Sequence, residues 1–170
     1  MRRMLLLLLC AASTLAAQES RARIGLPGFK DIFPIEDVTV PYELNGSFGR
    51  SYAAVKAAFV ELKLDLSVDD SVAGLLGNKK LSARVNFLGF PLSRLLDCGM
   101  TTMGQNADSF RLSIVFLALL DPIDATRTKL RLGFIAGGEP VSGPRRDAVT
   151  CGSTGVLESR LVQLASARLR

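Results

Sequence analysis

The sequence contains no histidine and no tryptophan, and only two of its 170 residues are tyrosines. Without histidine the chain cannot build a Ser-His-Asp or Cys-His catalytic arrangement, nor a histidine-ligated zinc site. Tryptophan and tyrosine supply the usual platforms on which bases and sugars stack, so their scarcity argues against nucleic acid as a partner. We therefore expect a protein that is not an enzyme and that uses no cofactor.

Long apolar runs are also scarce, and the clearest one lies at the N-terminus. Arg2 and Arg3 precede the apolar run Leu5–Leu9, and small residues follow up to Ala17. This order is typical of a secretory signal peptide, with cleavage after Ala16 or Ala17. The run is too short to span a bilayer. We expect residues 1–17 to be removed and the mature protein to be exported, to the periplasm or out of the cell.

Cysteine is rare, with only three residues in the chain. Cys10 lies within the predicted signal, and the leucines at positions 8 and 9 stand where a lipoprotein signal has small residues. We therefore expect no lipid anchor at Cys10.

The other two cysteines, Cys98 and Cys151, are each followed by glycine. In an exported protein a lone pair of cysteines is most simply a disulfide. A redox pair would normally show a Cys-x-x-Cys spacing, which is absent here. We expect a structural disulfide that ties the start of the last helix to the middle of a sheet and stabilises the fold by up to about 4 kcal/mol.

Residues 18–33 are predicted to form a flexible, solvated leader, because Gly25, Pro27 and Gly28 interrupt any periodicity. The remainder, residues 34–170, is predicted to be a single domain. Apolar residues at helical spacing predict helices over 51–62 and after Cys151, the second capped by Ser153 or Thr154, with a helical turn at 92–96. Alternating apolar residues predict five strands: 35–42, 63–68, 80–87, 109–120 and 128–135.

The fold class that follows is α+β, in the order strand, helix, four strands and helix. Short connections between consecutive strands favour an antiparallel sheet, and one apolar face on each element favours a two-layer sandwich with both helices on one face of about five strands.

This order resembles the helix-grip, or TATA-binding-protein-like, architecture. The paired Cys-Gly phrases, and above all the segment from Cys151 to Glu158, resemble exported bacterial envelope proteins that include the BamC-like lipoproteins. The resemblance covers about Ile35 to Leu169 and implies an envelope role. BamC-like proteins carry a lipid anchor, which is not expected here, and no functional residue is carried over.

Four carboxylates are the candidates for acid–base chemistry: Asp69 with Asp70, and Asp121 with Asp124. Both pairs fall in predicted turns, where aspartate commonly bonds the backbone. Asp121 and Asp124 would also suit calcium, but the rest of an oxygen-ligand loop is missing. The stretch Gly74–Asn78 is predicted to form a turn, because the segment Gly74–Lys79 lacks the spacing and the ending of a phosphate-binding loop. We expect structural roles for all of these residues.

Two further groups of residues admit a binding role. Met100, Thr101, Thr102 and Met103 form a flexible rim beside Cys98 that would suit a ligand mouth, although such residues more often fill a gap. The basic residues Lys79, Lys80, Arg127, Lys129, Arg131, Arg145 and Arg146 are expected to form solvated faces, with contact to anionic lipids or envelope polymers as the alternative.

Together these observations predict an exported, non-enzymatic binding or accessory protein of the bacterial cell envelope, whose partner is an envelope protein. The alternative is a carrier that holds an apolar small molecule between the sheet and a helix. The formal charge of +5 falls to +3 once Arg2 and Arg3 are removed, and this mildly basic balance also permits a peripheral contact with a membrane.

Overall fold

The structure, a computed structural model, describes residues 23–26, 29, 32–101, 104–141 and 148–170. The predicted signal with Cys10 lies outside these residues, as do Thr102, Met103, Arg145 and Arg146. Within the described part of the chain, no helix is both long and apolar enough to cross a membrane.

The fold is α+β and is built around a long hairpin of β11 (Phe110–Pro122) and β12 (Thr128–Pro140). Strand β5 (Leu75–Arg84) pairs with β11, and β4 (Val68–Asp70) pairs with β5. On the other side, β12 pairs with β3 (Val40–Leu44) and with β13 (Val149–Ser153). The short strands β6 (Asn86–Phe87), β7 (Phe90–Pro91) and β8 (Leu96–Asp97) extend the two edges. Every described strand pair is antiparallel, as predicted.

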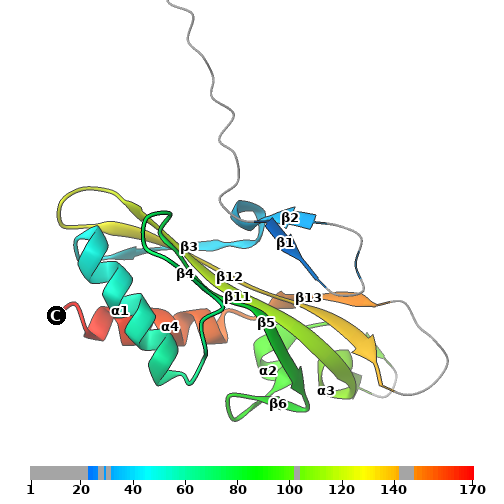
Figure 1. Ribbon diagram of the computed structural model, residues 1–170. Helices are drawn as coiled ribbons and strands as arrows, with labels where there is room; N and C mark the ends of the chain where they lie inside the picture. Colours follow the sequence, from blue (N-terminus) through cyan, green and yellow to red (C-terminus); the bar gives the residue numbers. More distant parts are fainter. Residues whose placement is uncertain (1–22, 27–28, 30–31, 102–103, 142–147) are drawn as a thin grey trace, which may run out of the picture.

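Two helices of normal length, α1 (Phe48–Glu61) and α4 (Val156–Ala167), lie on one face of the sheet (Figure 1). The single-turn helices α2 (Leu92–Leu95) and α3 (Asn106–Ser109) contribute to the same core. Phe116 contacts Phe59 and Phe134, with ring centroids 5.1 and 5.2 Å apart. These rings are almost fully buried, so the space between sheet and helices is filled by side chains of the protein itself.

The opposite face of the sheet is partly covered by the N-terminal segment, which corrects the prediction of a solvated leader. Strands β1 (Arg23–Gly25) and β2 (Ile32–Pro34) pair as a hairpin, and the 3-10 helix η1 (Ile35–Val38) follows (Figure 1). Ile24 and Leu26 are buried against Val115 and Leu117 in a second apolar cluster. Burying these side chains outweighs the irregular backbone around the glycines and prolines.

Other element boundaries also differ from the predictions. The predicted first strand divides into η1 and β3, and residues 63–67 form a loop in place of a strand. The predicted turn at Gly74–Asn78 belongs largely to β5, and short strands raise the sheet from about five strands to nine. The helix predicted at 51–62, the helical turn at 92–96 and the strands at 109–120 and 128–135 are confirmed, with shifted ends.

The predicted disulfide between Cys98 and Cys151 is present, with the Cα atoms 4.2 Å apart. Cys98 follows β8 and Cys151 lies inside β13, and these two strands pair with each other. The bridge therefore ties two neighbouring strands together at the edge of the sheet, while α4 begins only at Val156. Gly155 is the N-cap of α4, so neither Ser153 nor Thr154 caps it. Beyond Cys98, β9 (Met100–Thr101) pairs with β10 (Gly104–Gln105).

Candidate functional site

Helix α1 ends in a motif that normally uses glycine, but Lys63 stands at the glycine position. The Lys63 N–H donates to the Val60 carbonyl at 2.9 Å, and the Leu64 N–H donates to the Phe59 carbonyl at 3.0 Å. This is the Schellman pattern, which requires a left-handed residue after the helix. Lys63 adopts φ 57° there, a conformation that costs a residue with a side chain more than it costs glycine.

A second left-handed residue lies in the tight turn between β6 and β7. Leu88 (φ 52°) and Gly89 (φ 82°) connect Phe87 to Phe90, which pair with each other across the turn. Positive φ at both central residues is typical of type I′ turns, where asparagine and glycine are preferred. The turn therefore holds a half-buried leucine at a position that favours a smaller, polar residue.

Lys63 and Leu88 line the same surface hollow, which has a volume of about 500 Å³. The end of α1, the β6–β7 turn and the first turns of α4 form its walls. The apolar part of the lining is Leu62, Leu88, Phe90 and Leu157; the polar part is Glu61, Lys63 and Arg160, together with Gly89. A hollow of this size falls within the range of small-molecule sites.

A second, more open hollow of about 420 Å³ adjoins the first and shares Phe90 and Arg160 with it. Arg94 of α2 lines it, together with the start of α4 and the polar side chains Thr154, Ser159 and Gln163. The Arg94 guanidinium lies over the Phe90 ring, 5.0 Å from its centroid. We name the two hollows together the α1–α4 groove.

The α1–α4 groove carries an excess of positive charge. Its single carboxylate, Glu61, is paired with Arg168 at 2.6 Å. Its three cations, Lys63, Arg94 and Arg160, form no ion pair within the described part of the chain. Apolar walls beside unpaired cations are suited to a ligand that has both an apolar part and an anionic group.

The carboxylates singled out in the sequence are held in structural contacts elsewhere. Asp69 accepts hydrogen bonds from the Lys56 ammonium at 2.6 Å and from the Tyr52 hydroxyl at 2.7 Å. These donors hold the pKa of Asp69 below its usual value, while burial and the Asp69 contact raise the pKa of Tyr52. Asp70 accepts from the N–H groups of Val72 and Ala73 and so fixes the β4–β5 turn.

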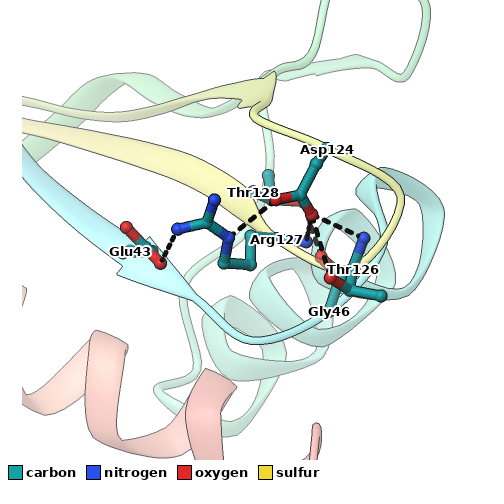
Figure 2. Close-up of polar contacts among 6 residues, drawn as sticks. All are labelled: Glu43, Gly46, Asp124, Thr126, Arg127 and Thr128. Carbon is teal, nitrogen blue, oxygen red and sulfur yellow. Dashed lines mark hydrogen bonds and ion pairs between the residues drawn. The ribbon is translucent and has the colours of Figure 1, made fainter.

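Asp124 organises the β11–β12 turn, as Figure 2 shows. It accepts from the N–H groups of Thr126 and Arg127, both at 2.8 Å, from the Thr126 hydroxyl at 2.9 Å and from the Arg127 guanidinium at 2.7 Å. These donors, the Thr126 N–H foremost, lower the pKa of Asp124 to about 2. Arg127 also reaches Glu43 on β3 at 3.2 Å.

Asp121 pairs with Arg131 at 2.8 Å, so neither carboxylate of the predicted pair stands free for acid–base work. No cluster of three or more potential metal ligands occurs among the residues that the structure describes. Met100 is largely exposed beside the disulfide and lies outside the lining of the α1–α4 groove.

Glu158, in the first turn of α4, is a further unusual carboxylate that was not among the candidates from the sequence. It is buried, and one of its carboxylate oxygens has no hydrogen-bond partner. Burial raises its pKa above the usual value, against a smaller opposing effect of the Ser153 side chain. The negative charge of Glu158 in turn adds to burial in raising the pKa of Tyr42.

The residues of the α1–α4 groove were not singled out in the sequence as a binding site, and Thr154 was considered only as a helix cap. They come from positions near 62, 89, 94 and 158, and no motif connects them. The one local signal is the turn-forming Leu88-Gly89 pair between two phenylalanines. Comparison with known protein families, with characterised proteins and with solved structures gave no match.

Proposed function

We propose that this protein is an exported, non-enzymatic binding protein of the cell envelope, and that the α1–α4 groove holds a small, largely apolar molecule. The observation that supports this most is the conjunction of four apolar lining residues, of which Leu88 and Phe90 are half-buried and Leu62 and Leu157 buried, with three cations that lack ion-pair partners in the described chain. The proposed ligand lies at the rim of the helix layer, because the interface between sheet and helix is filled by Phe59, Phe116 and Phe134.

Export is supported by the N-terminal sequence and by the Cys98–Cys151 bridge, which fits an oxidising compartment. Intact-mass analysis of exported protein should give a chain that begins after Ala16 or Ala17. A mass that includes a diacylglycerol on Cys10 would contradict the expectation that no lipid anchor is present.

A photoreactive phenylalanine analogue tests the proposed site even while the ligand is unidentified. It would replace Phe90 in the groove or, as a control, Val72, which is 96% exposed in the β4–β5 turn. Irradiation of the exported protein should add a small-molecule mass at position 90 and none at position 72. No adduct at position 90, or equal adducts at both positions, would contradict the proposal.

A second candidate, contact with an acidic envelope protein, is favoured by one feature of the other sheet face. Arg84 and Arg111 are direct neighbours across β5 and β11, and both are exposed. Their strand neighbours Ala83 and Leu112 are buried under the helices, so the two arginines point to the opposite face. Like charges directly opposite each other destabilise a sheet. Glu139 lies opposite Arg111 on β12, whereas Arg84 has Asn86 on its other side, so an acidic partner would offset the repulsion chiefly at Arg84.

This second candidate predicts salt-sensitive capture of an envelope protein that Arg84→Glu with Arg111→Glu abolishes. The same charge reversal at Lys129, which is exposed on β12, should leave capture unchanged. Equal loss from both variants would indicate nonspecific charge attraction and would contradict this candidate.

A further inference from the structure

A ligand in the α1–α4 groove would contact both apolar and positively charged side chains, which lie close together. The first, less open hollow, called the deeper hollow from here on, is lined by Leu62, Leu88 and Leu157. Arg160 lines both hollows. Lys63 approaches from the α1 side and Arg94 from the α2 side. An apolar chain in the deeper hollow, which Lys63 also lines, would therefore place its end near Arg160, where the hollow that Arg94 lines begins.

We infer that the ligand is an anionic amphiphile, with its apolar chain in the deeper hollow and its carboxylate or phosphate head at Arg160. This inference rests on the proposed function and specifies the class of molecule that the groove takes. Arg160 is the central contact of the head because it alone among the three cations borders both hollows. Planar guanidinium groups bind carboxylates and phosphates through two parallel hydrogen bonds.

Two of the three described non-glycine residues with positive φ support the same assignment from the backbone; the third, Val85, lies outside the lining of the groove. Lys63 and Leu88 both take left-handed conformations that favour glycine or asparagine. One supplies a cation to the hollow and the other an apolar wall. Strained residues of this kind tend to gather at functional sites. Glycine or asparagine would relieve the strain but would remove the charge of Lys63 or the apolar side chain of Leu88 from the groove.

The first turn of α4 adds to the positive character of the second hollow. The helix has twelve residues, and its N-cap Gly155 provides no side-chain cap; the carboxylate in its first turn, Glu158, is buried and accepts a hydrogen bond from its own N–H. Thr154, Gly155 and Val156 line the hollow. The partial positive charge of a helix start favours a negatively charged group nearby, which is the same preference that Arg94 and Arg160 create.

Calorimetric titration with dodecanoate, with neutral dodecanol as the matched ligand, tests the inference on the mature, disulfide-bonded protein. Dodecanoate should bind more tightly than dodecanol. The Arg160→Gln substitution should weaken the binding of dodecanoate by about fivefold, which is the contribution of one exposed ion pair. The binding of dodecanol should be unchanged. Adding Arg94→Gln should weaken dodecanoate further, while Lys129→Gln, on the sheet away from the groove, should have no effect. A titration with dodecyl phosphate in place of dodecanoate shows whether the groove prefers a phosphate or a carboxylate head.

The same experiments distinguish a wrong ligand class from a wrong binding site. Equal binding of dodecanoate and dodecanol, both insensitive to Arg160→Gln but weakened by Leu157→Ala, would overturn the anionic class and leave the groove as the site. Binding of neither ligand, together with no adduct at position 90, would overturn both. If Leu157→Ala does not fold, Leu88→Asn replaces it, because asparagine suits that turn.

Discussion

At the scale of single residues, the sequence departs from local preference where the groove is formed. The α1 end and the β6–β7 turn would both close more easily with glycine or asparagine than with Lys63 and Leu88. Neither residue is needed for the backbone hydrogen bonds at its position, since those bonds use main-chain atoms. The side chains are therefore better explained by what they present to the groove.

Replacing Lys63 with glycine should separate stability from binding. Lys63→Gly removes the strain of a left-handed lysine and should raise the free energy of unfolding by about 1 kcal/mol, as measured by urea denaturation. The same variant should bind dodecanoate more weakly. Lys63→Ala is the control, because alanine keeps the strain and loses the charge. A loss of stability in Lys63→Gly would contradict the strain argument.

Glu158 should make stability depend on pH. Because burial raises its pKa in the folded protein, the folded state binds a proton more tightly than the unfolded state. Its ionised form therefore destabilises the fold at neutral pH, and this effect disappears as the pH falls through its folded pKa towards the unfolded value.

Glu158→Gln removes that charge and should stabilise the protein by about 1 kcal/mol at pH 7. The difference from the native protein should shrink towards pH 4, because Glu158 is then protonated. Urea denaturation at several pH values measures both. A constant difference across the pH range would contradict the assignment.

At the scale of elements, the N-terminal hairpin is a structural part of the domain. Ile24 is 1% exposed against the second face of the sheet, whereas Ile32 on the partner strand is 61% exposed. The hairpin therefore has one buried side and one solvated side, although its two strands have only three residues each.

Ile24→Ala should destabilise the protein by about 2 to 3 kcal/mol, since it removes a buried isoleucine side chain. Ile32→Ala should change the free energy of unfolding by less than about 0.5 kcal/mol. Thermal or urea unfolding of both variants provides the comparison. Similar small effects from both would mean that the segment behaves as the solvated leader expected from its composition.

The sequence predicted an element correctly where its apolar residues follow one clear periodicity. It failed where a close backbone contact requires a residue that is typical of turns. The alternation over 109–120 predicted β11 correctly, and the strand runs from Phe110 to Pro122. The start of β5 was missed because Gly77 reads as a turn residue. In the structure, a Cβ on Gly77 would lie 2.3 Å from the Phe116 carbonyl oxygen, so glycine is required inside the strand.

The site was less predictable than the fold for a physical reason. The α1–α4 groove is assembled from an α1 end, a turn and the first turns of α4, which are brought together only by packing on the sheet. The disulfide was predictable because an expected export, with Cys10 in the predicted signal, leaves two cysteines and one simple pairing. The leader contains glycine and proline, and its composition alone could not show that it packs on the sheet. In the structure, Ile24 and Leu26 of this segment are buried against the second face of the sheet.

At the scale of the whole molecule, the Cys98–Cys151 bridge fastens the edge of the sheet on which α4 begins. Replacing both cysteines with serine should destabilise the protein by up to about 4 kcal/mol, according to the chain-entropy estimate for a long loop. Urea denaturation of the variant against the oxidised protein measures this loss. The native protein after reduction is the control and should lose a similar amount. An unchanged midpoint in both would show that the bridge adds nothing to stability.

Methyl chemical shifts during titration with dodecanoate test the central claim most directly, because they locate the ligand on the intact molecule. The account predicts that the methyl signals of Leu62, Leu88 and Leu157 shift and saturate together. The methyls of Ile24 and Leu26, on the far side of the sheet, should not move. Shifts confined to Ile24 and Leu26, or no saturable shift at the three groove leucines, would contradict it.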